Sequence, residues 1–111
     1  MGALITGMGS ICALGRGIPA LWSAIAAGRD GMVNIERFST EGFKSKIAGM
    51  VPDRNSISGT SVSISRLNIE FALDAACEAW EMAGLDLSGI PLNRIALVFG
   101  TSLGDSEMPL H

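Results

Sequence analysis

Residues 94–104 read RIALVFGTSLG, an apolar run that opens into a glycine-rich loop. A second apolar run, GALITG, occupies residues 2–7 and also ends in glycine. Short continuous apolar runs bounded by turn residues are typical of buried strands, and strands that are apolar on both faces belong to parallel sheets covered by helices. The two runs therefore predict strands over 2–7 and 94–99, in an α/β fold whose parallel or mixed sheet is covered by helices.

A first helix is expected soon after the first strand. Apolar residues recur at helical spacing through residues 18–26, Pro19 stands where a first helical turn tolerates proline, and Gly28 supplies the stop. This pattern predicts a helix over 19–27. Because Trp22 lies in its apolar stripe, we expect Trp22 to be a core residue.

A second and longer helix is predicted over 66–83, ending at Gly84, with Ser63 or Ser65 as a possible cap. Its apolar stripe includes Trp80, which we also expect in the core. The narrow remaining face carries four acidic residues, Glu70, Asp74, Glu78 and Glu81. Such a row of carboxylates on a helix is usually a solvated face, and paired carboxylates for acid–base chemistry are the alternative. Between the helices, Phe38, Phe43 and the run IAGMV at 47–51 can anchor a loop or a small hairpin.

The composition is too apolar for a free-standing domain of this length. Of the 111 residues, 48% are hydrophobic and 17% are charged, whereas about 25% are charged in typical domains. We therefore expect the chain either to bury itself against a partner or to be part of a larger protein.

The net charge of −3 and the absence of a basic run argue against nucleic-acid binding. The apolar stretches fall short of the about twenty residues that span a bilayer, and no signal-type segment follows Met1, so we expect no membrane span and a cytoplasmic location.

The sequence offers few groups for cofactor or metal chemistry. The glycines of GMGSIC at residues 7–12 follow a predicted strand, but a dinucleotide fingerprint needs a third glycine where Cys12 stands, and the helix begins too late to hold a pyrophosphate. Cys77 lies on a helix stripe, where a small buried thiol is expected. The single histidine is His111, so neither cysteine has the usual partner of a catalytic thiol, and no metal site can be assembled. We expect no cofactor and no metal.

Taken together, these segments resemble the start of the β-ketoacyl-acyl-carrier-protein synthases, condensing enzymes of the thiolase-like superfamily. The stretches that carry the resemblance come in the family's order and spacing over almost the whole chain: LITGMG at 4–9, LG at 14–15, AGRDG at 27–31, IERF at 35–38, IAG at 47–49, FALDAA at 71–76, AGLD at 83–86 and RIALVFGTSLG at 94–104. The resemblance implies a thiolase-like layered fold of two similar halves, of which residues 1–111 would be part of the N-terminal half.

The resemblance also implies an activity. Family members condense a malonyl thioester with an acyl chain held on a cysteine, work with an acyl carrier protein, and usually form a homodimer. That cysteine and two histidines lie downstream of the glycine-rich loop, beyond His111, so we expect no catalytic residue in this chain and no condensation by it alone.

Only one set of site residues carries over from the family. The loop Gly100, Thr101, Ser102, Leu103 and Gly104 matches the loop beside the acyl pocket, and the residue that matches Leu103 helps to bound that pocket. These five residues are the predicted substrate-binding site. Two alternatives stay open at this stage: a non-catalytic partner subunit resembling a chain-length factor, which would form a heterodimer with a catalytic subunit, and an unrelated small α/β binding module.

Overall fold

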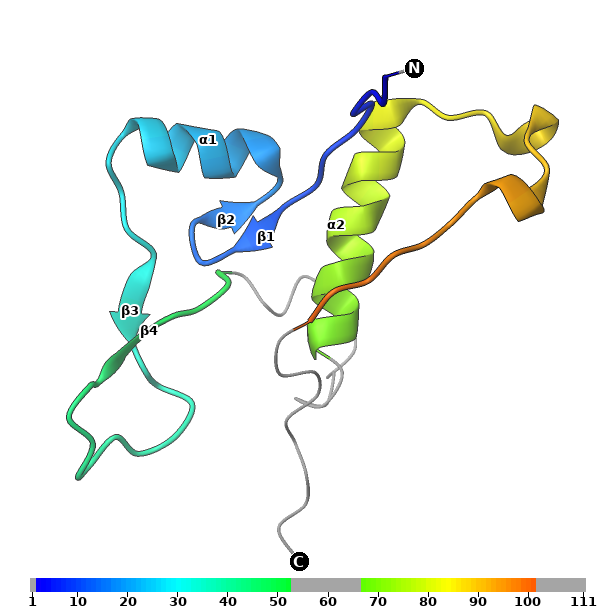
Figure 1. Cartoon of the computed structure of the whole chain (residues 1–111). Helices are drawn as coiled ribbons and strands as arrows, with labels where there is room; N and C mark the ends of the chain where they lie inside the picture. Colours follow the sequence, from blue (N-terminus) through cyan, green and yellow to red (C-terminus); the bar gives the residue numbers. More distant parts are fainter. Residues whose placement is uncertain (1, 53–66, 102–111) are drawn as a thin grey trace, which may run out of the picture.

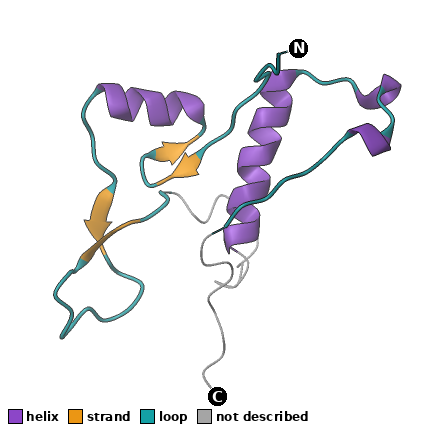
Figure 2. Ribbon diagram, viewed as in Figure 1, coloured by secondary structure: helices purple, strands orange, loops and turns teal. Residues whose placement is uncertain are grey.

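A computed structural model describes residues 2–52 and 67–101 of the chain. The described part contains two α-helices, two pairs of short strands and two 3₁₀ turns (Figures 1 and 2). In chain order the elements are β1 (Ile11–Cys12), β2 (Gly15–Arg16), α1 (Ile18–Ala26), β3 (Met32–Asn34), β4 (Ile47–Gly49), α2 (Leu67–Ala83), η3 (Leu87–Gly89) and η4 (Leu92–Arg94).

Helix α1 confirms the predicted first helix to within one residue at each end. Pro19 lies in its first turn, as expected from the fixed φ of proline. At the other end Gly28 adopts a φ of 65°, a conformation that glycine takes without a steric penalty. The amide of Gly28 donates to the carbonyl of Ile25 (3.0 Å), and that of Arg29 donates to the carbonyl of Ala24 (2.9 Å). These two bonds form the Schellman closure that ends the helix.

Helix α2 confirms the predicted second helix over nearly the same residues. It ends before Gly84, whose φ is 58° and whose amide donates to the carbonyl of Glu81. The two candidate caps at its start, Ser63 and Ser65, lie outside the described residues. In Figure 1 the helix stands upright beside the N-terminal segment, and the β1–β2 hairpin lies between it and α1.

Of the two alternatives for the stretch between the helices, a loop or a small hairpin, the structure shows the hairpin. Strands β3 and β4 are antiparallel, with Val33 opposite Ala48, and the pairing extends beyond them because the amide of Ile35 donates to the carbonyl of Lys46 (2.9 Å). The rings of Phe38 and Phe43 meet edge to face in the connecting loop, with their centroids 6.0 Å apart. An aromatic contact therefore anchors this loop, as the sequence suggested.

The predicted strands over 2–7 and 94–99 are not formed. Residues 2–7 and 95–99 are loops, drawn in teal in Figure 2, and Arg94 is the last residue of η4. The side chains of Leu97 and Val98 are 89% and 91% exposed. Both strand pairs in the described residues are antiparallel, so the parallel or mixed sheet is not confirmed. The physical reason is that a strand is a cooperative object, which needs a neighbour to satisfy its amide and carbonyl groups. Neither apolar run has such a neighbour in the part of the chain that the structure describes.

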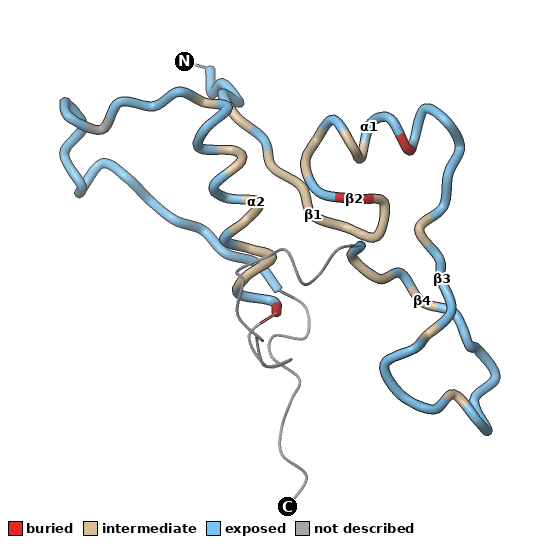
Figure 3. Tube along the Cα trace, turned by 180° about the vertical axis from the view of Figure 1, so that it is seen from behind, coloured by how far each residue is buried: buried red, intermediate tan, exposed pale blue. Residues whose placement is uncertain are grey.

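Little apolar surface is buried in the described residues. Among their hydrophobic side chains only Ala24 and Leu67 are buried (Figure 3). Trp22 is 70% exposed and Trp80 is 42% exposed, so the prediction that both tryptophans lie in the core is wrong for this chain. The helical periodicity was correct, but within the described residues no other segment covers the apolar faces on which the two tryptophans lie. No helix there is long and apolar enough to cross a membrane.

Candidate functional site

The predicted substrate-binding loop is described only at its start. Gly100 and Thr101 are exposed, at the end of the extended segment that follows η4 (Figure 1). A Cβ added at Gly100 would have no atom within 4 Å. The remaining predicted site residues, Ser102, Leu103 and Gly104, lie outside the described residues. The role of this loop in substrate binding therefore stays a prediction.

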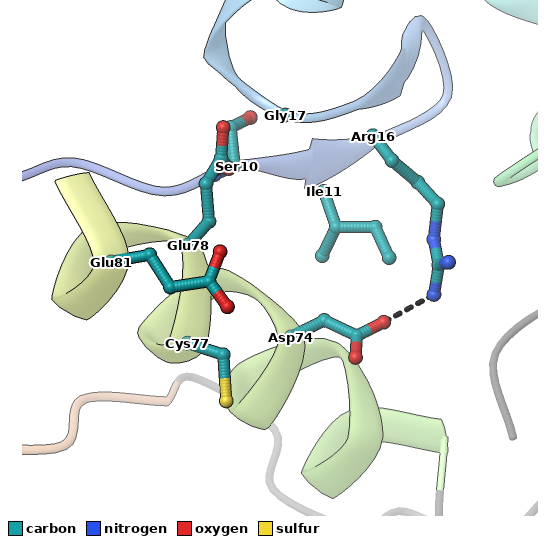
Figure 4. A pocket seen from close by; sticks show the side chains of 8 residues that line it. All are labelled: Ser10, Ile11, Arg16, Gly17, Asp74, Cys77, Glu78 and Glu81. Carbon is teal, nitrogen blue, oxygen red and sulfur yellow. Dashed lines mark hydrogen bonds and ion pairs between the residues drawn. The ribbon is translucent and has the colours of Figure 1, made fainter.

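A pocket of about 310 Å³ lies where the β1–β2 hairpin meets α2 (Figure 4). Two sides of the pocket come from segments far apart in the sequence, and its polar groups are mostly charged. The lining residues are Ser10, Ile11, Arg16, Gly17, Asp74, Cys77, Glu78 and Glu81. Three of the four residues of the acidic row on α2 therefore face this pocket.

Glu78 occupies the centre of the contact between hairpin and helix. One carboxylate oxygen accepts the backbone N–H of Ser10 (2.8 Å), and the other accepts the backbone N–H of Ile18 (2.7 Å). Ile18 is the first residue of α1, where backbone N–H groups have no partner within the helix and the helix dipole is positive. Glu78 thus supplies the carboxylate of a helix N-cap from a different helix, because the N-cap residue Gly17 has no side chain to do so.

The other carboxylates of the row have different surroundings. Asp74 forms an ion pair with Arg16, at the rim of the pocket and partly exposed. Glu81 is exposed, whereas Glu70 is half-buried. The interpretation of the row as a solvated face is therefore wrong for Glu78 and Glu70 and correct for Glu81, and Asp74 is a partly exposed member of it that pairs with Arg16. Periodicity alone identified the face but could not show that another segment covers it.

The cysteines also differ from expectation in part. Cys77 is exposed and lines the pocket, so the prediction of a buried thiol is wrong. Cys12 is half-buried in β1. Within the described residues no group of three His, Cys, Asp or Glu side chains is arranged to hold a metal ion.

The glycines of the GMG motif lie directly against α2. A Cβ added at Gly7 would overlap the carbonyl oxygen of Ala79, and one added at Gly9 would overlap that of Ala75. Carbonyl oxygens carry partial negative charge, so the space beside these glycines is filled by groups that repel a phosphate. The two glycines permit close contact between main chain and helix, which supports their interpretation as structural and not as a nucleotide site.

The pocket therefore lies at the contact between the β1–β2 hairpin and α2. Its best-placed carboxylates are engaged, Glu78 with two backbone amides and Asp74 with Arg16. Neither contact was expected from the sequence, in which the nearest signal was the i, i+4 spacing of Asp74 and Glu78 on one helix face.

Comparison with known proteins identifies the family. Residues 3–110 match the family described as "Beta-ketoacyl synthase, N-terminal domain". The chain belongs to the β-ketoacyl synthases. This match covers nearly the whole sequence and confirms the resemblance carried by the eight short stretches of the sequence analysis. For the fold, membership of a β-ketoacyl synthase domain implies the thiolase-like architecture.

The relatives of this chain include 3-oxoacyl-[acyl-carrier-protein] synthases and polyketide ketoacyl synthases. The chain is 32% identical over 108 residues to the 3-oxoacyl-[acyl-carrier-protein] synthase 2 of Vibrio cholerae, covering 95% of this chain and 26% of the relative. It is 31% identical over 104 residues to the tetracenomycin polyketide synthase ketoacyl synthase alpha subunit of Streptomyces glaucescens, covering 91% of this chain and 24% of that protein. The chain thus spans about a quarter of the length of these curated relatives.

Proposed function

We propose that this chain is the N-terminal portion of a 3-oxoacyl-[acyl-carrier-protein] synthase, which condenses a malonyl thioester with an acyl thioester in fatty acid or polyketide synthesis. The observation that carries the proposal is the match of residues 3–110 to the N-terminal domain of the β-ketoacyl synthases. The two kinds of relative support both pathways equally. Residues 1–111 would form part of the first half of the thiolase-like domain, and the parallel or mixed sheet would need strands from the rest of that domain.

The chemistry of condensation requires groups that this chain lacks. An acyl chain is carried as a thioester on a cysteine, and loss of CO₂ from the malonyl thioester supplies the carbanion that attacks it. In the family this cysteine and two histidines follow the glycine-rich loop. Neither Cys12 nor Cys77 matches the nucleophile, and the only histidine of the sequence is His111. The proposal therefore assigns no catalytic residue to this chain.

The proposal is tested by measuring condensation directly. The chain of 111 residues is incubated with acyl and malonyl thioesters of an acyl carrier protein, and 3-oxoacyl products are sought by mass spectrometry. No product is expected, whereas a protein that continues into the remaining synthase domain should form it. Condensation by residues 1–111 alone would overturn this account of where the chemistry lies. A continuation without an active-site cysteine and two histidines would favour the non-catalytic partner subunit instead.

We also propose that Gly100, Thr101, Ser102, Leu103 and Gly104 line the acyl pocket of the parent enzyme. In the complete synthase, Leu103→Phe should shorten the longest acyl chain accepted, and Leu103→Ala should lengthen it, because the side chain at this position bounds the pocket. The readout is the chain-length distribution of the products. Leu92→Phe, in the exposed η4 turn, is the matched control and should leave the distribution unchanged. An unchanged distribution in both Leu103 variants would remove this loop from the pocket.

The partners follow from the same family membership. We propose an acyl carrier protein with its thioesters as the partner of the parent enzyme, a dimer as its assembly, and the cytoplasm as its location. The name of the relative from Vibrio cholerae includes the acyl carrier protein, which supports this partner. Analytical ultracentrifugation of the complete synthase tests the dimer, and a sedimentation coefficient of a monomer at micromolar concentration would contradict it.

A further inference from the structure

The contact between α2 and the N-terminal part of the chain depends on hydrogen bonds and on close main-chain contacts at Gly7 and Gly9 more than on buried apolar side chains. We call residues 7–28, from Gly7 to the closing glycine of α1, the N-terminal unit. Its only buried hydrophobic side chain is Ala24, which lies in α1. In Figures 1 and 3, which show opposite sides of the molecule, α1 lies beyond the hairpin and away from α2. The hairpin and the chain before it therefore make the joint.

One side chain of α2 joins two separate points of this unit. The carboxylate of Glu78 accepts the N–H of Ser10, just before β1, and the N–H of Ile18, at the start of α1. The hairpin is closed between these points because the amide of Gly17 donates to the carbonyl of Ser10 (2.7 Å). Glu78 therefore holds both ends of the hairpin and the first turn of α1 at once.

The backbone at Gly17 is shaped around this carboxylate. Gly17 has a φ of 85°, and a Cβ added there would lie 2.9 Å from a carboxylate oxygen of Glu78. A side chain at this position would compete for the space that Glu78 occupies. The absence of a side chain at Gly17 thus has two effects: it permits the positive φ of the backbone, and it leaves room for the carboxylate of Glu78.

We propose that Glu78 is a latch: the N-terminal unit opens from α2 as one body when this carboxylate is removed or neutralised, while α2 stays helical. A glutamine at this position can accept at its single oxygen only, because its amide nitrogen would present hydrogens to the second backbone N–H. The charged and titratable side chains around Glu78 are Arg16 from β2 and Asp74, Cys77 and Glu81 from α2. The ion pair of Arg16 and Asp74 stabilises the contact with α2 less, since both side chains are partly exposed to water.

The test compares Glu78→Gln with Glu81→Gln in the full chain of 111 residues. Both substitutions remove one negative charge from the same pocket, but the carboxylate of Glu81 is exposed. Amide hydrogen exchange is measured at Ser10, at Ile18 and along residues 79–83 of α2. Loss of a charge-assisted hydrogen bond should lower protection at Ser10 and Ile18 by about tenfold or more in Glu78→Gln. Protection in α2 should stay within about twofold, and Glu81→Gln should match the unaltered chain.

A second measurement does not depend on resolved amide signals. Cys77 lines the pocket under the hairpin, whereas Cys12 does not line it and is half-buried within the N-terminal unit. Opening of the latch should raise the rate of alkylation of Cys77 severalfold in Glu78→Gln, and Cys12 should keep its rate because the unit moves as one body. The proposal is overturned if Glu78→Gln and Glu81→Gln give equal rates at Cys77 and equal protection at Ser10 and Ile18. It is also overturned if protection falls equally along α2, which would show loss of the whole fold.

Discussion

At the scale of the residue, Gly9 shows how the main chain reaches α2. An added Cβ would overlap the carbonyl oxygen of Ala75, which belongs to the backbone of a helix and cannot move aside without breaking helical hydrogen bonds. Gly9→Ala should therefore lower the free energy of unfolding by about 3 kcal/mol, the upper end of the usual cost of overpacking. The measurement is the urea midpoint followed by tryptophan fluorescence. Gly2→Ala is the control, because a Cβ there meets no atom within 4 Å. Equal midpoints for the two variants would contradict the close contact.

A second residue-scale prediction concerns Asp86. The backbone N–H of Ser88 (2.9 Å) and then its hydroxyl (2.8 Å) donate to this carboxylate and hold its pKa below the ordinary value of 3.8. Because the folded-state pKa is lowered, the two bonds stabilise the fold above the ordinary pKa, and this contribution is lost as the pH falls through the lowered value. Ser88→Ala should raise the pKa of Asp86 towards 3.8 but not fully, since the backbone bond remains. Carbon-detected NMR titration measures it, with Ser88→Thr, which keeps a hydroxyl, as the control.

At the scale of the element, the closure of α1 depends on one glycine. Gly28 has a φ of 65°, and a Cβ there would meet no atom within 4 Å. Any cost of Gly28→Ala is therefore a backbone cost, about 1 kcal/mol, from forcing an L-residue into the left-handed region. Thermal unfolding followed by circular dichroism should show this loss. Gly89→Ala has equal space and no positive φ, so it should change the unfolding temperature little. A larger loss in Gly89→Ala than in Gly28→Ala would refute the argument.

The elements also show which sequence patterns suffice for a prediction. Both helices were predicted from residues within or next to them, because helical periodicity and glycine stops act over a few residues. The β3–β4 hairpin was one of two alternatives for its stretch, and the structure decided between them. The strands expected over 2–7 and 94–99 depend on neighbours that the described residues do not supply. Apolar runs indicated the right kind of segment, but pairing is a property of two segments and not of one.

At the scale of the whole molecule, the described chain is open. Its radius of gyration is 17.3 Å, whereas a compact chain of this length has about 13 Å. Large apolar side chains remain exposed on both helices and on the last described segment, among them Trp22, Leu73 and Phe99. Exposed apolar surface of this kind favours association.

The chain of 111 residues should therefore self-associate when it is studied alone. Size-exclusion chromatography with light scattering should give a mass above 11.6 kDa that rises with concentration, and the dye ANS should bind strongly. A protein that carries these residues together with the rest of a β-ketoacyl synthase domain is the control and should bind ANS weakly. A monodisperse monomer that does not bind ANS would show that residues 1–111 bury more apolar surface than the structure does.

The sequence by itself determined the family and the two helices with their glycine ends, and it left a loop and a small hairpin as alternatives for the stretch between them. These follow from local spacing and from residue identity. The sequence also identified the acidic row of α2, but not the contacts that these carboxylates make. Gly100 to Gly104 remain a prediction that rests on family membership.

Only the tertiary structure decided that Glu78 accepts hydrogen bonds from two backbone amides and that Asp74 pairs with Arg16. It also gave the reason why Gly7 and Gly9 have no side chain, which is that a helix lies against them. Each of these contacts joins residues about sixty or more positions apart in the chain. A helix pattern states which side chains share a face, but what covers that face depends on how distant segments pack. Hydrogen bonds and van der Waals contacts act over a few ångströms, so their partners are decided when the chain folds and not by their order in the sequence.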